Sequence, residues 1–294
     1  MLMNDFNSLV PTQNFNRRGF VGTAVGAGVG IGFAASVLPV SAQTIKTDST
    51  GLTVGEVTIM VGDFKMAAYR AAPAGKTNLP VVLVISEIFG VHEHIADVAR
   101  RFAKLGYLAI APEMFLRQGD AQSYAEVSKL IAEVISKVPD AQVMGDLDAT
   151  VAWAQANGGD TSKLGITGFC WGGRITWMYA AHNPKVKAGV AWYGRLVGTP
   201  NALSPTNPID VVGKLNAPVL GLYGGADSGI PQESVDKMKA ALATGNDAAK
   251  RAEFMVYPDT PHAFHADYRA SYRKEPADDG WKRATAWFKA NGVA

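Results

Sequence analysis

The sequence predicts an α/β fold in which helices cover both faces of a mostly parallel sheet, all within a single domain. Two observations support this prediction. Short apolar runs of strand length alternate along the chain with longer segments whose apolar residues recur at helical spacing. Several of the short runs are unbroken and β-branched, which is typical of strands buried on both faces. Such alternation favours parallel strands joined by helical crossovers.

The expected elements follow the order of such a fold. Strands are expected at residues 52–60, 64–71, 81–85, 107–111, 164–167, 186–192, 218–223 and 253–257. Helices are expected at residues 95–105, 124–138, 144–157, 174–181, 232–243 and 279–290. Residues 196–216 are polar and rich in proline, so we expect a loop there.

Turn and breaker residues justify these boundaries. Gly62-Asp63 predicts a tight turn, so the first two strands should open the domain as a hairpin. Pro80 precedes the run Val-Val-Leu-Val-Ile of the third strand, and Gly106 ends the first helix in the position of a left-handed cap. Pro139 separates the next two helices.

The first 42 residues resemble an export signal rather than part of the domain. Residues 16–20 (Asn-Arg-Arg-Gly-Phe) form a twin-arginine pattern, followed by a mildly apolar run from Val21 to Leu38. Residues 40–42 (Val-Ser-Ala) have the spacing that a signal peptidase accepts, which predicts cleavage after Ala42. The alternative is an uncleaved membrane anchor, because the apolar run is about as long as a bilayer span requires.

This signal predicts a periplasmic or secreted protein whose precursor has the twin-arginine export machinery as a partner and which has no stable membrane span after cleavage. Residues 43–294 then form one large domain, long enough for a full core. The 28 basic and 26 acidic residues give a formal charge of +2, so nucleic acid is not an expected partner. A single cysteine cannot form an internal disulfide, and an unpaired thiol in an oxidising compartment points to chemistry.

That cysteine, Cys170, lies in the sequence Gly-Phe-Cys-Trp-Gly-Gly directly after the expected fifth strand. The spacing Gly-x-nucleophile-x-Gly is that of a nucleophile elbow, with sulfur in place of the more usual serine oxygen. Gly168 and Gly172 would relieve the collisions that a Cβ makes at such a tight strand-to-helix turn. The helix N-terminus that follows favours a thiolate or an oxyanion. The alternative is a buried, inert cysteine in a glycine-rich turn.

An acid and a histidine follow at the ends of later strands. Asp227 comes after the seventh strand, and His262 comes after the eighth. Loops after successive parallel strands share one edge of the sheet, so these side chains can converge on Cys170. The order nucleophile, acid, histidine is that of the α/β-hydrolase fold. Asp259 is the rival for the acid, and His265 is the rival for the base.

Glu87 ends a strand that should be buried, so its carboxyl needs a polar partner, for which the thiol is one candidate. A solvated strand-end glutamate is the alternative. The backbone N–H groups of Ile88 and Trp171 occupy the positions of oxyanion donors. His92 and His94 suggest a metal site, but they lack a third ligand, which favours a capping or solvent-facing role.

From about Val54 to the last helix, the chain resembles the dienelactone hydrolases. The resemblance rests on the four motifs Glu-Ile-Phe-Gly at 87–90, Gly-Phe-Cys-Trp-Gly-Gly at 168–173, Gly-Ala-Asp at 225–227 and His-Ala-Phe at 262–264. It implies a triad of Cys170, Asp227 and His262. It also implies that Glu87 contacts the resting thiol and helps to deprotonate it when substrate binds.

In this family two arginines hold the carboxylate of the substrate. The sequence Pro-Glu-Met-Phe-Leu-Arg at 112–117 matches the context of the first, which assigns that role to Arg117. The position of the second is Ala266 in this chain, and Arg269 is the nearest alternative. Tyr193, at the end of the sixth strand, either lines the pocket or packs in the core.

The sequence therefore predicts an enzyme that cleaves a small ester or lactone through a thioacyl intermediate on Cys170. It calls for no metal and no organic cofactor. Three alternatives stay open at this stage. They are a thiol acyltransferase on the same fold, a periplasmic binding protein that does no chemistry, and a redox-sensing thiol.

Overall fold

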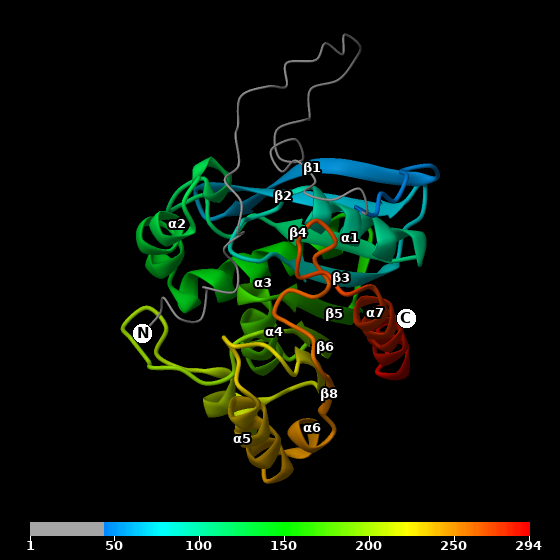
Figure 1. Cartoon of the computed structure of the whole chain (residues 1–294). Coiled ribbons are helices and arrows are strands. Elements are labelled where there is room, and N and C mark those ends of the chain that lie inside the picture. The colour runs from blue at the N-terminus through cyan, green and yellow to red at the C-terminus, as the bar shows by residue number, and fades with distance from the viewer. Residues whose placement is uncertain (1–43) are drawn as a thin grey trace.

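Eight strands form one continuous sheet in the computed structural model, which describes residues 44–294 (Figure 1). The strand order is β1-β2-β4-β3-β5-β6-β7-β8. The strands are β1 Leu52–Val61, β2 Phe64–Pro73, β3 Leu79–Ile85, β4 Leu108–Pro112, β5 Gly159–Phe169, β6 Val186–Trp192, β7 Val219–Gly224 and β8 Glu253–Tyr257. The β1–β2 and β2–β4 pairs are antiparallel, and the pairs from β4 through β3 to β8 are parallel. The predicted hairpin and the mostly parallel sheet are confirmed.

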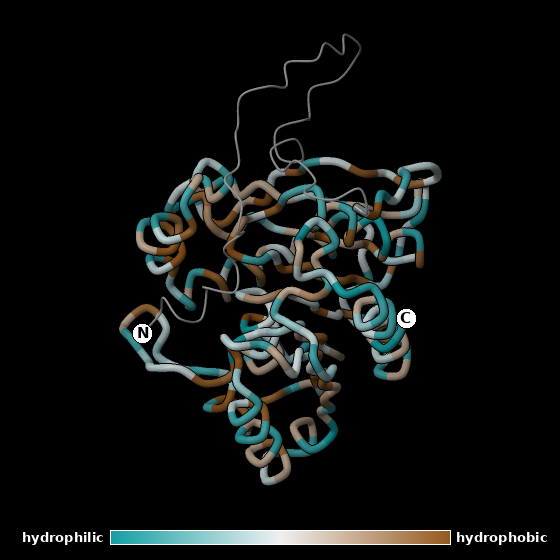
Figure 2. The backbone as a smooth tube through the Cα atoms, viewed as in Figure 1, coloured by the Kyte–Doolittle hydropathy of each residue, from teal (hydrophilic) through white to brown (hydrophobic). Residues whose placement is uncertain are grey.

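The helices lie between these strands. They are α1 Glu93–Lys104, α2 Val127–Glu133, α3 Asp140–Ala156, α4 Trp171–His182, α5 Gln232–Ala243, α6 Asp247–Lys250 and α7 Lys274–Ala290. Three short 3₁₀ helices complete the set: η2 Ala121–Ser123, η3 Ile135–Lys137 and η4 Pro208–Lys214. Figure 2 shows hydrophilic segments along α5 and α7, on the outside of the molecule.

Two glycines in β5 show that helices cover both faces of the sheet. A Cβ on Gly165 would lie 3.0 Å from the ring of Phe288 in α7. Gly168 lies three positions further on, so its Cβ would point to the opposite face. That Cβ would meet the backbone oxygen of Gly172, in α4, at 2.1 Å. The α4 and α7 helices therefore pack on opposite faces of the strand that leads to Cys170.

Each helical layer is joined by its own contacts. Phe102 of α1 packs against Phe288 of α7 with 5.8 Å between the ring centres. On the other face, the hydroxyl of Tyr179 in α4 donates a hydrogen bond to Asp148 in α3 at 2.9 Å. The predicted single-domain α/β fold, with helices on both faces, is therefore confirmed.

Several predicted boundaries were wrong, for local reasons. The α7 helix begins at Lys274 rather than at residue 279, because Pro276 lies in the first turn, where its missing N–H costs no hydrogen bond. The α3 helix begins directly after Pro139, and α4 begins directly after Cys170, earlier than expected. The expected helix 124–138 is divided into α2 and η3, and the expected loop 196–216 contains η4.

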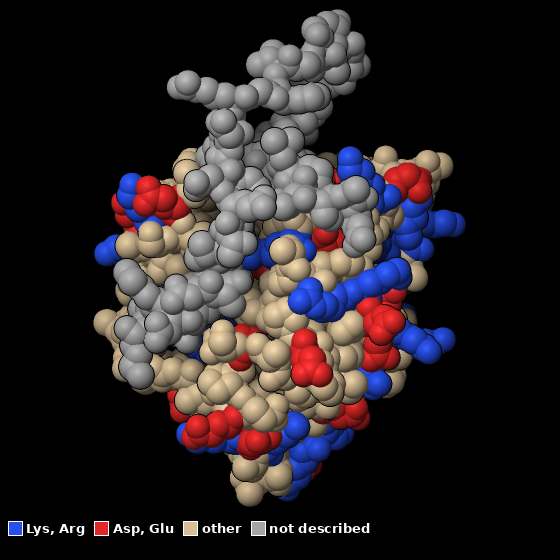
Figure 3. All heavy atoms as spheres, in the orientation of Figure 1, with Lys and Arg blue, Asp and Glu red and all other residues tan. Residues whose placement is uncertain are grey.

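Basic and acidic side chains are interspersed on the part of the surface that the described residues form in Figure 3, rather than gathered into one extended patch of a single sign. Within residues 44–294, no helix is both long enough and apolar enough to span a membrane. The predicted signal peptide, its twin-arginine pattern and the cleavage after Ala42 lie outside the described residues.

Candidate active site

Cys170 occupies a strained turn between β5 and α4. Its backbone angles are φ 53° and ψ −111°, a positive φ that L-residues rarely adopt. A Cβ on Gly172 would lie 2.4 Å from the carbonyl oxygen of Ile85, so the turn packs too tightly against β3 for a side chain there. The N–H of Cys170 donates a hydrogen bond to the carbonyl of Trp192 at 3.0 Å, which anchors the turn to β6. The nucleophile position is thus held rigidly at the end of β5.

Asp227 and His262 form a hydrogen-bonded pair near this turn. Asp227 Oδ2 lies 2.6 Å from His262 Nδ1. The other carboxylate oxygen accepts from the backbone N–H groups of Gly229 at 2.9 Å and Ile230 at 3.2 Å. These contacts fix the carboxylate, which in turn orients the imidazole so that Nε2 is turned away from Asp227.

The environment of His262 favours its protonated form. Burial opposes the positive charge, but a thiolate at Cys170 and the hydrogen bond to Asp227 outweigh it and raise the pKa of His262 to about 10. His262 Nε2 makes no hydrogen bond within ordinary distance limits to a described residue, yet the sulfur is close enough to shift this pKa.

The two rivals from the sequence take no part in this pair. Asp259 is exposed and lies in a turn with φ 52°, while Asp227 holds the histidine. His265 is buried with its ring 4.5 Å from that of Trp192, and its burial lowers its pKa well below the ordinary value. The structure therefore brings together Cys170, His262 and Asp227.

The N–H groups of Ile88 and Trp171 lie in the loop after β3 and at the first position of α4. Neither donates a hydrogen bond to any residue between 44 and 294. Free N–H groups at a helix start and in a strand-end loop are suited to bind an oxyanion. That these two groups form an oxyanion hole stays a prediction.

A pocket opens over Cys170. Its cavity volume is about 100 Å³, several times the roughly 10–15 Å³ that one water requires. Its lining residues are Ile131, Ile135, Ser136, Val138, Cys170, Trp171, Arg174, Tyr193, Arg195, Asn201, Ser204, Gly229, Ile230 and His262. One wall is apolar and comes from α2 and η3, and another is polar and comes from the chain after β6. No acidic side chain is part of this lining.

Comparisons with known proteins agree with this geometry. The family model described as the dienelactone hydrolase family matches residues 66–292. The chain belongs to the dienelactone hydrolase family. It is 58% identical over 292 residues to a Methylorubrum extorquens protein provisionally named a carboxymethylenebutenolidase, covering 99% of this chain and 98% of that protein.

Further members of the family match nearly as much of the chain. A protein of Escherichia coli K12 with the same provisional name is 52% identical, over 89% of this chain and 96% of its own length. The crystal structure of a Klebsiella pneumoniae protein provisionally named a dienelactone hydrolase is 55% identical, with a TM-score of 0.79 over 81% of this chain and 98% of that one. The protein is therefore a hydrolase of the dienelactone hydrolase type.

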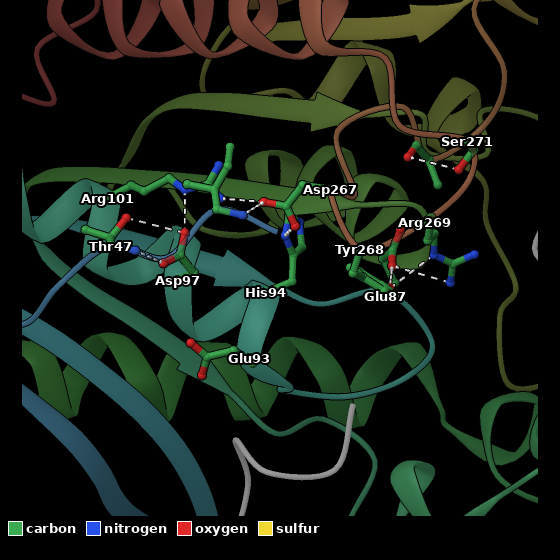
Figure 4. A network of polar contacts seen from close by, with 12 residues as sticks. Thr47, Glu87, Glu93, His94, Asp97, Arg101, Asp267, Tyr268, Arg269 and Ser271 are labelled. Carbon is green, nitrogen blue, oxygen red and sulfur yellow. Dashed lines mark hydrogen bonds and ion pairs between the residues drawn. The ribbon is translucent and has the colours of Figure 1, made fainter. Parts of the chain in front are cut away.

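Glu87 departs from what the family resemblance implies. It is fully buried, so the solvated alternative is wrong. Its Oε2 atom accepts a hydrogen bond from the hydroxyl of Tyr268 at 2.7 Å and lies 3.7 Å from Arg269 Nη2 (Figure 4). Its Oε1 atom has no hydrogen-bond partner among the described residues, so no hydrogen bond joins Glu87 to Cys170. Burial opposes its charge, but Arg269 and Tyr268 together lower the pKa of Glu87.

The predicted role of Arg117 in binding a substrate carboxylate is not supported. Its guanidinium forms a two-pronged ion pair with Asp146 of α3, at 2.5 and 2.7 Å, and lies 4.0 Å from the centre of the Phe64 ring. It does not line the pocket over Cys170. Its charge is already matched by a buried carboxylate, so this arginine ties α3 to the hairpin.

Arg269 and Tyr193 lie closer to the predicted site. Arg269 packs over the Phe89 ring at 4.8 Å, and although burial opposes its charge, Tyr268, Glu87 and, to a smaller extent, Cys170 raise its pKa. Tyr193 lines the pocket with its ring 5.0 Å from that of His262, and it has a positive φ of 39°. It is fully buried, so the two interpretations from the sequence, pocket and core, both apply.

The capping or solvent-facing role expected for His92 and His94 was wrong. Both are buried, and the side chain of His92 forms no cap hydrogen bond although it precedes α1. His94 Nδ1 instead pairs with Asp267 at 3.0 Å. Among residues 44–294, no three His, Cys, Asp or Glu side chains are grouped so that they could hold a metal ion.

Sequence reasoning missed two residues near the site: Arg174, which lines the pocket, and Tyr268, which contacts Glu87. Arg174 lies four positions after Cys170 in α4, a spacing that places it one turn away and could have identified it. It forms a two-pronged pair with Asp140 at 2.8 and 2.7 Å and donates to the carbonyl of Thr206 at 2.7 Å, which fixes the pocket wall after β6. Tyr268 carried no signal, because only the fold brings it to Glu87.

Proposed function

We propose that this protein hydrolyses a small ester or lactone through a covalent thioacyl intermediate on Cys170. The observation that carries the proposal is one shared pocket. Cys170, on a strained elbow, and His262, oriented by Asp227, line the same cavity. Such a cavity, with a nucleophile, a base and an orienting acid in chain order, is suited to acyl transfer. Its modest volume and its apolar wall favour a small acyl group.

Acylation would begin with the thiolate of Cys170 attacking the carbonyl carbon of the substrate. Sulfur forms a bond to carbon, and the carbonyl electron pair moves to oxygen. The N–H groups of Ile88 and Trp171 would stabilise that oxyanion. When the tetrahedral intermediate collapses, the carbon–oxygen ester bond breaks, and the imidazolium of His262 donates its Nε2 proton to the departing alkoxide. The result is a thioester on Cys170 and a neutral imidazole.

Deacylation would use the same groups in reverse. The neutral His262 accepts a proton from water at Nε2, and the hydroxide attacks the thioester carbon. Collapse releases the carboxylic acid and regenerates the thiolate beside an imidazolium, which Asp227 stabilises. Neither step requires a group that the described residues lack.

The substitution Cys170→Ala tests the proposal directly. We expect hydrolysis of p-nitrophenyl acetate to fall to the buffer rate, while the circular dichroism spectrum and melting temperature stay close to wild type. Mass spectrometry of acid-quenched wild type should show an acetyl group on Cys170. Unchanged turnover in the variant would overturn the proposal. Products formed with an added alcohol acceptor would instead identify the thiol acyltransferase, and an inert, unacylated Cys170 would favour a binding protein.

We also propose that the precursor is exported through the twin-arginine pathway and cleaved after Ala42. The support is the pattern at residues 16–20 and the small residues at 40–42. Replacing Arg17 and Arg18 together by lysine should retain the full-length chain in the cytoplasm of the host. The wild-type protein should appear in the periplasmic fraction with Gln43 at its N-terminus. Equal distribution of both forms would refute export by this route.

A further inference from the structure

The loop that carries the Ile88 N–H is held by contacts at both of its ends. At its far end, Glu113 Oε2 accepts from the N–H of Val91 at 2.7 Å, and a Cβ on Gly90 would lie 2.5 Å from the same oxygen. Gly90 has φ 73°, and because it has no side chain, the Glu113 carboxylate can lie this close to its backbone. At the near end, the only polar contacts of Glu87 within the described chain come from Tyr268 and Arg269. The position next to Ile88 therefore depends on these two residues.

Tyr268 and Arg269 belong to the segment 262–273 that follows β8, here called the histidine loop because it begins with His262. The hydroxyl of Tyr268 donates to Glu87 Oε2 at 2.7 Å and accepts from Arg269 Nε at 3.1 Å. Figure 4 shows both side chains converging on Glu87. One hydroxyl thus connects the loop that carries the base to the loop that carries an oxyanion donor.

We propose that Tyr268 is a positioning residue. It holds Glu87, and through Glu87 the Ile88 N–H, at the distance from His262 that acyl transfer requires. This inference rests on the proposed function, since it concerns the same acyl-transfer site. Oxyanion donors act only when their N–H groups lie within about 2.7–3.1 Å of the developing charge. A buried carboxylate gripped by a phenol and a guanidinium is a rigid attachment for the neighbouring backbone.

The hydrogen bond from Tyr268 also bears on the contact with the resting thiol that the family resemblance implies for Glu87. Its Oε2 atom is engaged by Tyr268, and its Oε1 atom is buried with no hydrogen-bond partner among the described residues. Moving the carboxylate to Cys170 would require breaking a short hydrogen bond to a phenol and separating the charge from Arg269. In this arrangement Glu87 supports the loop that carries the Ile88 N–H.

This support should depend on pH, because only an ionised Glu87 pairs with Arg269. The titratable side chains that face Glu87 or its partners are Tyr268 and Arg269 of the histidine loop, His92 and His94 at the start of α1, Tyr193 after β6 and Cys170 at the start of α4. Burial and the neighbouring His94 lower the pKa of His92 to about 3, so it stays neutral above that pH. Removing the Tyr268 hydroxyl takes away one of the contacts that lower the pKa of Glu87.

The test compares Tyr268→Phe with Tyr272→Phe, a matched control on the same loop whose ring is only partly buried. In Tyr268→Phe we expect kcat for p-nitrophenyl acetate to fall about tenfold, less than the roughly 10²–10³-fold cost of losing an oxyanion donor outright. KM should stay within about twofold, because the acyl pocket is intact. The acid limb of the kcat profile should move to higher pH. Tyr272→Phe should match wild type in all three.

Two further measurements do not depend on turnover. Hydrogen exchange in the peptide covering residues 86–92 should be faster in Tyr268→Phe than in wild type or Tyr272→Phe. Alkylation of Cys170 by iodoacetamide should keep its wild-type rate, within about twofold, in Glu87→Gln and in Tyr268→Phe. Faster alkylation in Glu87→Gln would show that Glu87 guards the thiol and would overturn the inference.

The outcomes separate failure of this inference from failure of the proposed function. If Cys170→Ala retains activity, the proposed function fails, while the exchange measurement still decides whether Tyr268 holds the loop. If wild type hydrolyses the ester but Tyr268→Phe changes neither exchange nor the acid limb, the positioning role is wrong. Faster exchange with unchanged kcat would also overturn it, because the loop would then not limit catalysis.

Discussion

The described residues include two buried aspartate–histidine pairs that differ in what surrounds them. Asp227 and His262 are 2.6 Å apart, and His262 lines the pocket that contains Cys170. Asp267 and His94 are 3.0 Å apart and are enclosed by aromatic rings, among them Tyr268 at 5.4 Å from the His94 ring. The same chemical pair is therefore placed once at a cavity and once inside the core.

The partners of the two carboxylates explain the difference. Apart from His262, the side chain of Asp227 has only backbone N–H groups as hydrogen-bond partners within residues 44–294, which leaves its charge available to stabilise an imidazolium. Asp267 also pairs with Arg101 at 2.9 Å (Figure 4). It accepts a further hydrogen bond from the N–H of Ile45 at 3.1 Å. Burial opposes its ionisation, but His94, Arg101 and the Ile45 N–H lower the pKa of Asp267 to about 2. This pair ties α1, the histidine loop and the start of the described chain together.

The largest expected effect is a loss of catalytic activity when the histidine of the first pair, but not that of the second, is replaced. Asparagine at either histidine keeps a donor near the aspartate but removes the titratable ring. In His262→Asn we expect kcat/KM for p-nitrophenyl acetate to fall about 10³-fold, within the range for loss of a general base. In His94→Asn we expect kcat/KM within about threefold of wild type and a loss of about 1–3 kcal/mol in the free energy of unfolding. Equal losses of kcat/KM in His262→Asn and His94→Asn would show that the two pairs do not differ in function.

A smaller effect should appear in stability as pH is lowered. Burial and its histidine neighbour lower the pKa of His92 to about 3 in the folded state, against about 6.5 in an unfolded chain. The stability that neutral His92 contributes is therefore present above pH 6.5 and is lost as pH falls towards 3, at up to about 1.4 kcal/mol per pH unit. His262, with its raised pKa, has the opposite sign, and its contribution is lost as pH rises towards 10.

Urea unfolding of wild type and His92→Phe between pH 8 and pH 4 measures the acid side of this contrast. The decline below pH 6.5 should be shallower in the variant, because it has one fewer buried group to protonate. Parallel curves would show that His92 does not cause the decline. Between pH 8 and pH 10, the His262→Asn variant should lose less stability than wild type does.

The smallest effect concerns a third pair, on the surface. His182 Nε2 lies 2.8 Å from Asp148 Oδ2, with 41% and 47% of the two side chains exposed. Exposed ion pairs contribute little, because water screens them and ordering the side chains costs entropy. In His182→Ala we expect the free energy of unfolding to change by less than about 1 kcal/mol, with wild-type kcat/KM. A loss in the free energy of unfolding as large as that of His94→Asn would show that burial does not determine how much each pair contributes to stability.

Local sequence patterns were enough to predict most of the fold. The alternation of apolar runs and helical segments led to the eight strands and their order along the chain, and the Gly-x-Cys-x-Gly spacing led to the strained turn at Cys170. Boundaries failed where a residue that usually breaks a helix lies in its first turn, as Pro276 does in α7. The start of α7 was therefore predicted more than one turn too late.

What the sequence by itself determined is the set of chemical groups at the strand ends, because turn glycines and strand lengths are local properties of the chain. Only the tertiary structure decided how those groups pair. In the folded chain Glu87 contacts Tyr268 and Arg269 and forms no hydrogen bond to Cys170, and Arg117 pairs with Asp146. The physical reason is that a buried charge takes whichever partner packing brings within a few ångströms. That distance depends on contacts between residues far apart in the chain, such as Glu87 and Tyr268, which no local pattern contains.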